Sequence, residues 1–166
     1  STFADVSIVK LDSQGVKQWE YLFSTEFASN YDYPLFLELG SDNDIYFGAT
    51  SEISISQPFR HAYIGKLNHN GTAAWTKNLD EILPHHEDFE SFFAFTDKAT
   101  ANLYVTYTVR KWLPAGIIKI TYFLAITPDG TVKENYRIPN LAKFLESDAV
   151  IAFQDQDALN LRRLLI

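Results

Sequence analysis

The sequence predicts an all-β fold built from a tandem repeat, because one motif and one period recur along its 166 residues. The clearest copy of the motif, residues 61–75, is typical of a strand, a tight Asn-Gly turn and a second strand. Related copies occupy residues 5–19 and, in a weaker form, 123–135. Helical periodicity is poor except at 140–146, where one helical turn is expected.

Two independent markers give the repeat a period of about 57 residues. The turn glycines Gly15, Gly71 and Gly130 are 56 and 59 residues apart. The strand-like segments starting at residues 44, 102 and 158 align at offsets of 58 and 56. Because the two markers agree, we expect each period to be one structural unit.

Each complete unit carries four short runs rich in Tyr, Phe, Ile, Val and Thr, which favour strands. Strands are expected at 34–39, 44–50, 61–67 and 72–79 in unit 33–79, and at 90–96, 102–109, 119–126 and 131–138 in unit 90–138. The chain opens with the last two strands of a unit, 5–11 and 16–23, and closes with the first two, 148–153 and 158–165. Segments 148–166 and 5–23 would thus form one unit split between the termini, giving twelve strands in one domain spanning 1–166.

A resemblance to a known family rests on the pattern D-x-x-x-x-K-L-x-x-x-G-x-x-x-W at 5–19 and on the related segment 44–75. These segments resemble the bacterial β-propeller repeat family and are similar to the tryptophan-containing repeats of quinoprotein-type propellers. The resemblance covers nearly the whole chain. It implies a β-propeller with three four-stranded antiparallel blades per chain, one of them split between the termini.

The third unit departs from this pattern. Glu134 stands where the other units have Trp19 and Trp75, and Ala125 stands where they have lysine. The cofactor residues of quinoprotein propellers do not map onto identifiable positions, so no cofactor is expected.

Three blades are too few for a ring, since propellers have about four to eight. We expect a homodimer in which a two-fold axis completes a six-bladed ring. The N-terminal strands of one chain would finish the blade begun by the C-terminal strands of the other. The alternative is a fragment of a longer propeller.

The composition limits the partners. The chain has 14 basic and 21 acidic residues, a net charge of −7, which argues against nucleic acid and anionic membranes as ligands. No window approaches the roughly 18 apolar residues of a membrane span, and without cysteine there are no disulfides and no Cys-type zinc sites. The chain has no methionine and starts at Ser1, so a processed chain, secreted or extracytoplasmic, or an excised domain is expected.

The long segments between strands are expected to be loops that form one binding face, at 24–33, 51–60, 80–89, 110–118 and 139–147. On this face an acid precedes the innermost strand of each unit, at Asp32, Asp88 and Asp148. In a ring these three carboxylates would surround the channel mouth and suit a hard cation such as Ca²⁺. Alternatively, each caps its own loop by accepting backbone N–H bonds.

Two further groups are candidate ligand-binding residues. The densest group of potential metal ligands is His85, His86, Glu87 and Asp88. Aromatic side chains suited to stacking on a sugar ring, or to packing between blades, are Phe27, Tyr31, Tyr33 and Trp112. For the histidine group, a solvated polar loop is the simpler interpretation.

The sequence favours a non-enzymatic binding or scaffold module for a protein or glycan ligand. One alternative is a carbohydrate-binding lectin, assisted by calcium. Another is an extracytoplasmic hydrolase or lyase that acts through the loop at 85–88 and the channel-mouth acids. No catalytic residue is identified, because no nucleophile elbow or phosphate-binding glycine loop accompanies the polar side chains.

Overall fold

The structure is a computed structural model that describes residues 5–25, 31–40, 43–54, 57–82, 88–114, 116–138, 153–155 and 158–160. In these residues the chain is all-β with twelve strands, as the repeat predicts, and it also has one short helix that the repeat does not predict. The elements are β1 (Val6–Leu11), β2 (Lys17–Phe23), β3 (Tyr31–Leu39), β4 (Ile45–Ser54), β5 (Gln57–Leu67), β6 (Ala73–Asn78), α1 (Leu79–Ile82), β7 (Asp88–Thr96), β8 (Leu103–Leu113), β9 (Gly116–Ile126), β10 (Val132–Ile138), β11 (Phe153–Asp155) and β12 (Ala158–Asn160).

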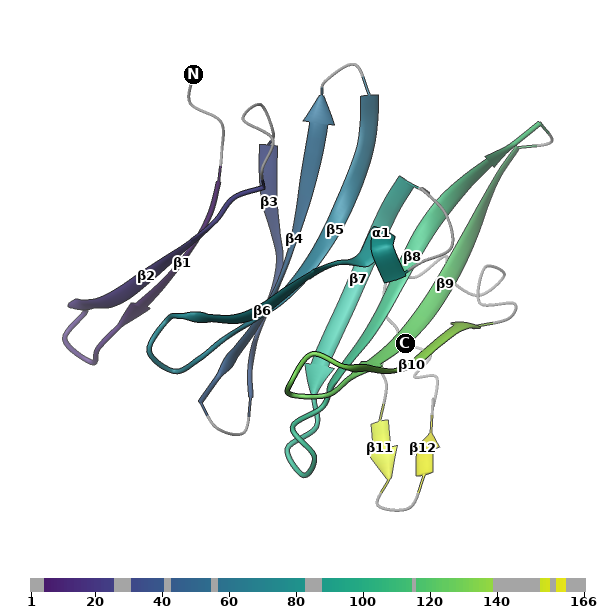
Figure 1. The fold of residues 1–166 in the computed structure, drawn as a ribbon. Helices are drawn as coiled ribbons and strands as arrows, with labels where there is room; N and C mark the ends of the chain where they lie inside the picture. The colour runs from purple at the N-terminus through teal and green to yellow at the C-terminus, as the bar shows by residue number, and fades with distance from the viewer. Residues whose placement is uncertain are drawn as a thin grey trace.

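The strands form antiparallel sheets whose order follows the chain. Strands β3 to β6 form one four-stranded sheet and β7 to β10 another, while β1 pairs with β2 and β11 pairs with β12. Figure 1 shows the β1-β2 hairpin and the two larger sheets following one another in an open row. The described residues form neither a closed ring nor a propeller.

Two expected loops are instead long hairpins. Strands β4 and β5 run through most of 51–60, and β8 and β9 through most of 110–118. The prediction of long loops there was wrong, because paired strands satisfy each other's backbone groups beyond the edge of the core. Helix α1 occupies part of the segment 80–89, whereas the helical turn expected at 140–146 lies outside the described residues.

The same turn geometry recurs in the three hairpins that carry the repeat motif. The φ angles of Gly15, Gly71 and Gly130 are 81°, 85° and 88°. Glycine suits this left-handed region because it has no Cβ to clash with the following carbonyl. The register also repeats: Trp19 lies opposite Lys10 and Trp75 opposite Lys66, while Glu134 lies opposite Ala125.

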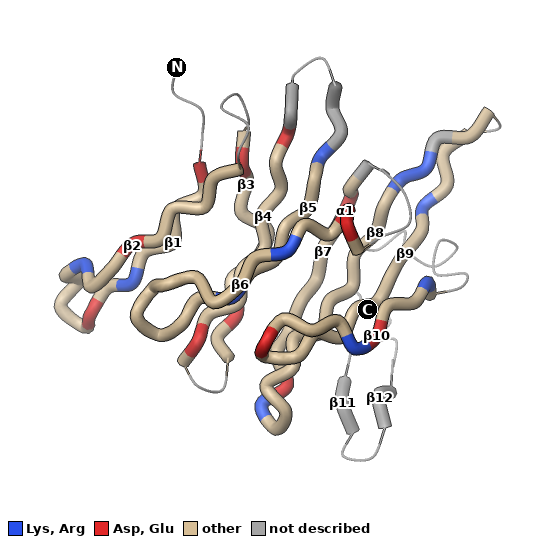
Figure 2. The backbone as a smooth tube through the Cα atoms, in the orientation of Figure 1, with Lys and Arg blue, Asp and Glu red and all other residues tan. Residues whose placement is uncertain are grey.

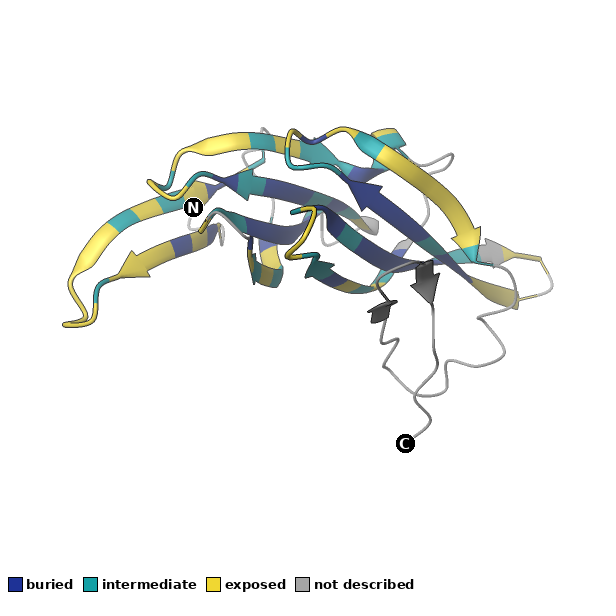
Figure 3. Cartoon of the chain, turned by 90° about the horizontal axis from the view of Figure 1, so that it is seen from below, coloured by how far each residue is buried: buried dark blue, intermediate teal, exposed yellow. Residues whose placement is uncertain are grey.

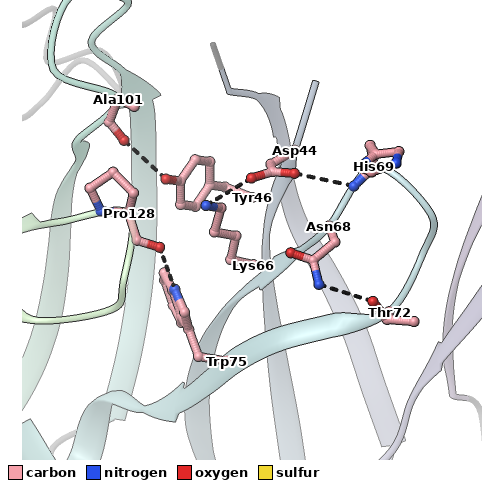
Figure 4. Close-up of polar contacts among 9 residues, drawn as sticks. All are labelled: Asp44, Tyr46, Lys66, Asn68, His69, Thr72, Trp75, Ala101 and Pro128. Carbon is pink, nitrogen blue, oxygen red and sulfur yellow. Dashed lines mark hydrogen bonds and ion pairs between the residues drawn. The ribbon is translucent and has the colours of Figure 1, made fainter. Parts of the chain in front are cut away.

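Trp19 and Trp75 each join their own sheet to the next one. The indole Nε1 of Trp19 donates to the carbonyl of His69 at 3.1 Å. In the same way, the indole Nε1 of Trp75 donates to the carbonyl of Pro128 at 3.0 Å, as Figure 4 shows. The rings lie directly on the turn glycines, because a Cβ added at Gly71 or Gly130 would come within 2.6 or 3.0 Å of the indole. We call this contact the Trp–turn joint.

Other polar contacts strengthen the same end of the sheets. Tyr46 in β4 donates its hydroxyl to the carbonyl of Ala101, in the turn between β7 and β8, at 2.9 Å (Figure 4). Within its own sheet, Asp44 pairs with Lys66 at 2.8 Å and accepts the backbone N–H of His69 at 3.1 Å. The bond to Asp44 therefore fixes the backbone at His69, whose carbonyl accepts the indole N–H of Trp19.

The hydrophobic core lies between neighbouring units. Val6, Ile8 and Phe23 of the hairpin form one buried cluster with residues of β4 and β5, such as Phe47 and Leu67. A second, larger cluster joins sheet β3–β6 to sheet β7–β10. Figure 3 shows burial concentrated in the middle of the row and exposure on the hairpin beside the N-terminus.

A pair of glycine substitutions is expected to isolate the Trp–turn joint. Gly15→Ala should cost about 1 kcal/mol from the left-handed backbone alone, because in the described part of the chain no atom lies within 4 Å of the added Cβ. Gly71→Ala should cost a further 1–3 kcal/mol or so by displacing Trp19. Urea unfolding of the two variants measures the difference in unfolding free energy. Equal losses of stability in Gly15→Ala and Gly71→Ala would contradict the Trp–turn joint.

Candidate functional site

A pocket with a volume of about 490 Å³ opens between the β1-β2 hairpin and the sheet β3–β6. Volumes of about 300–1,000 Å³ are usual for small-molecule sites. The lining residues come from the end of β2 and the chain after it, from β5 and β6, and from α1; they are Tyr21, Phe23, Ser24, Thr25, Tyr63, Thr76, Asn78 and Glu81. The pocket lies at the end of β2 and β6 from which the chain continues to the next sheet.

Strand alternation and a helix cap position these side chains. Tyr21 and Phe23 are two residues apart in β2 and therefore share one face, and the ring centroid of Phe23 lies 5.4 Å from that of Tyr63. Asn78 ends β6 and its Oδ1 accepts the backbone N–H of Asp80 at 3.0 Å. Glu81 three residues later completes the capping-box sequence pattern, and the bond from Asp80 to the Asn78 side chain caps the start of α1 at the rim.

A histidine–carboxylate pair lies beside the pocket. His61 precedes the pocket residue Tyr63 by two positions in β5, and its Nδ1 contacts a carboxylate oxygen of Asp80, the residue before Glu81. The hydrogen bond to Asp80 raises the pKa of His61 above its usual value, and partial burial opposes this only in part. Figure 2 shows the acidic residues on α1 that give this rim its negative charge.

Behind the pocket wall lies a buried carboxyl group. Asp32 is 4% exposed, and its Oδ1 has no hydrogen-bond partner among the described residues. Burial is the main reason that its pKa is raised, while hydrogen bonds from the side chain of Ser51 and the backbone of Thr25 lower the pKa in part. Thr25 also contacts Ser51, with 3.1 Å between their hydroxyl oxygens, and itself lines the pocket.

The structure places Asp32 differently from the sequence prediction. The residue lies inside β3, opposite Ser51 of β4, and not in a loop before the innermost strand. Its neighbours Tyr31 and Tyr33 point to the opposite face of β3, where Tyr33 is 42% exposed with the guanidinium of Arg60 5.7 Å from its ring centre. The three residues therefore do not form one ligand surface.

Most other predicted site residues lie outside the described part of the chain. These are Phe27, His85, His86, Glu87 and Asp148. Asp88 begins β7 and Trp112 lies in β8, but their side chains are outside the description as well. Among the residues that are described, no three His, Asp or Glu side chains are grouped to hold a metal ion.

The sequence analysis singled out none of the pocket residues, although Ser24, Thr25 and Glu81 lie in two of the segments, 24–33 and 80–89, expected to form the binding face. Tyr21, Phe23 and Tyr63 look like ordinary strand residues, and only the packing of one unit on the next turns them toward a common space. One signal was available, because the Asn-Leu-Asp-Glu segment starting at Asn78 is typical of a helix N-terminus. That signal predicts α1 and places Glu81 on it.

Comparison with known proteins finds no family model that matches the chain and no match among the curated proteins searched. In the part of the chain that the structure describes, no helix has the length and apolar character needed to cross a membrane.

The His61–Asp80 pair should make stability depend on pH. Because the pKa of His61 is raised in the folded protein, its contribution is fully present below the unfolded value of about 6.5 and is lost as the pH rises through the folded value. We expect Asp80→Asn to flatten the pH dependence of the unfolding free energy above about pH 6.5, measured by urea titration at several pH values. If the unfolding free energies of wild type and Asp80→Asn depend on pH in the same way, the proposed contribution of the His61–Asp80 pair is contradicted.

Proposed function

We propose that the chain is a non-enzymatic binding module that holds a carbohydrate in the pocket between the β1-β2 hairpin and the sheet β3–β6. The observation that carries this proposal is the meeting of aromatic rings with hydroxyl, amide and carboxylate groups around one space of about 490 Å³. Sites for small ligands combine apolar and aromatic walls with a few polar groups that fix orientation.

The two kinds of lining side chain match the two kinds of sugar surface. The rings of Tyr21, Phe23 and Tyr63 provide apolar area for the C–H face of a pyranose. Asn78 and Glu81 provide hydrogen-bonding groups for its hydroxyls. Glu81 is exposed, so its carboxylate is available to accept hydroxyl donors. A neutral sugar also fits the negative charge of this rim better than an anion would.

We propose further that the row of units belongs to a β-propeller completed by a second copy. Strand β1 packs on β3 as β5 packs on β7, which supports the interpretation of the β1-β2 hairpin as the outer half of a four-stranded unit. Among the described strands, β1 pairs only with β2, so its other edge is open. The strands near the C-terminus of a second chain would pair there and complete six blades as a homodimer.

Carbohydrate binding is tested by a glycan array run with calcium and with a chelator, followed by calorimetry on the best sugar. Glu81→Gln removes the charge and Thr76→Val removes the hydroxyl, both at exposed positions of the pocket. Loss of a charged hydrogen bond should weaken binding about tenfold or more in Glu81→Gln.

Glu134→Gln is the matched control, because Glu134 is exposed on β10 and is not among the lining residues. It should bind as the wild type does. Absence of any sugar bound by the folded protein, or equal affinity in all variants, would reject the pocket as a carbohydrate site.

The homodimer is tested separately by light scattering coupled to size-exclusion chromatography. A mass of twice 19.0 kDa is expected at micromolar concentration. A folded monomer over the whole accessible concentration range would contradict completion by a second copy.

A further inference from the structure

One of the three repeat turns lacks the partner that the other two have. The turn closed by Gly15 makes the same backbone hydrogen bonds as the turns of Gly71 and Gly130. Its φ of 81° is also the same. The tryptophans of the preceding units cover Gly71 and Gly130, whereas no atom of the described residues lies within 4 Å of a Cβ placed on Gly15.

The strand leading into this turn is uncovered as well. Leu11 is 54% exposed, whereas Leu67 and Ile126, its counterparts in the next two units, are fully buried. Val9 and Val16 beside it are 45% and 58% exposed. If the preceding unit were removed from the Trp–turn joint at Gly71 or Gly130, an exposed apolar strand end beside an uncovered glycine would remain. The turn of Gly15 has this appearance. We call the turn Asp12–Val16 together with Leu11 the bare turn.

The other end of the row carries the complementary position. In β10, Glu134 lies opposite Ala125 in the register that places Trp19 opposite Lys10. In the units before it, this position contacts the turn of the next unit. Glu134 is exposed, and in the part of the chain that the structure describes it covers no turn glycine. One end of the row therefore carries the bare turn, and the other end carries Glu134, which occupies the position that contacts such a turn in the other units.

We propose that the bare turn of one copy receives the third unit of a second copy, with Glu134 of that copy at the place of the indole. This proposal rests on the proposed homodimer and names the residues of its junction. It continues the interface that already joins the units inside the chain. The carbonyl of Ser13, two residues before Gly15, would stand where those of His69 and Pro128 accept the indole N–H.

The junction between copies would then be weaker than the joints within a copy. A carboxylate has no N–H to donate to the carbonyl of Ser13, and its charge is repelled by that oxygen. It also lacks the ring that covers the turn glycine elsewhere. Association of copies is therefore reversible, and the side chain at position 134 sets its strength.

Glu134→Trp is the variant that tests this contact in the full chain. The new indole should fill the bare turn and tighten self-association at least about tenfold, measured by sedimentation over a dilution series. Lys133→Trp is the matched control, because it adds the same ring one position earlier, at the bulge between Val132 and Glu134. It should leave self-association as in the wild type.

Gly15→Asn combined with Glu134→Trp locates the contact. Asparagine tolerates the left-handed backbone, and its side chain would occupy the space that the indole needs. This double variant should return to wild-type association, with circular dichroism confirming its fold. The proposal is overturned if Glu134→Trp associates no more tightly than wild type, or if the double variant keeps the gain. Wild-type dimerisation together with either of these results would leave the homodimer standing and reject only this junction.

Discussion

The arrangement of the sheets depends on a turn glycine whose lack of a side chain leaves room for an indole to lie on it. At Gly71 and Gly130 two requirements coincide, since the turn needs a positive φ and the ring of Trp19 or Trp75 needs the space of a Cβ. The indole N–H then donates to a carbonyl two residues before the glycine. Together with the buried clusters between the sheets, this contact fixes how neighbouring units pack against each other.

The joint and the pocket lie at opposite ends of the same pair of elements. Trp19, near the start of β2, closes the gap to the next unit at the repeat turn. Phe23, at the end of β2, lines the pocket with Tyr63 and Asn78. A rigid contact at one end holds two surfaces at a fixed separation at the other, which is how a preformed ligand site is built on a scaffold.

Sequence reasoning found the parts of the fold that have local causes. Turn glycines with positive φ, the cross-strand Trp19–Lys10 and Trp75–Lys66 pairs and the strand composition all leave a periodic trace in the chain. The hairpin extensions through 51–60 and 110–118 were missed because Pro and Gly near their tips are typical of loops as much as of hairpins.

The pocket could not be predicted because it belongs to no single segment. Tyr21, Tyr63 and Glu81 are brought together by packing between units, and the sequence gives no register for that packing. The predicted acid Asp32 illustrates the same limit, since its position before a strand suggested an exposed ligand and its burial follows from pairing with β4. Local sequence patterns determine the strands and turns, whereas a site formed between units depends on how the Trp–turn joints hold those units.

The proton NMR spectrum of the three turn glycines tests the Trp–turn joint most directly. An indole face lying on a glycine shifts its Hα protons upfield. We expect this shift, with nuclear Overhauser contacts to the ring, at Gly71 with Trp19 and at Gly130 with Trp75, and an ordinary shift at Gly15. Three glycines with the same ordinary Hα shifts and no contacts to an indole would contradict the joint.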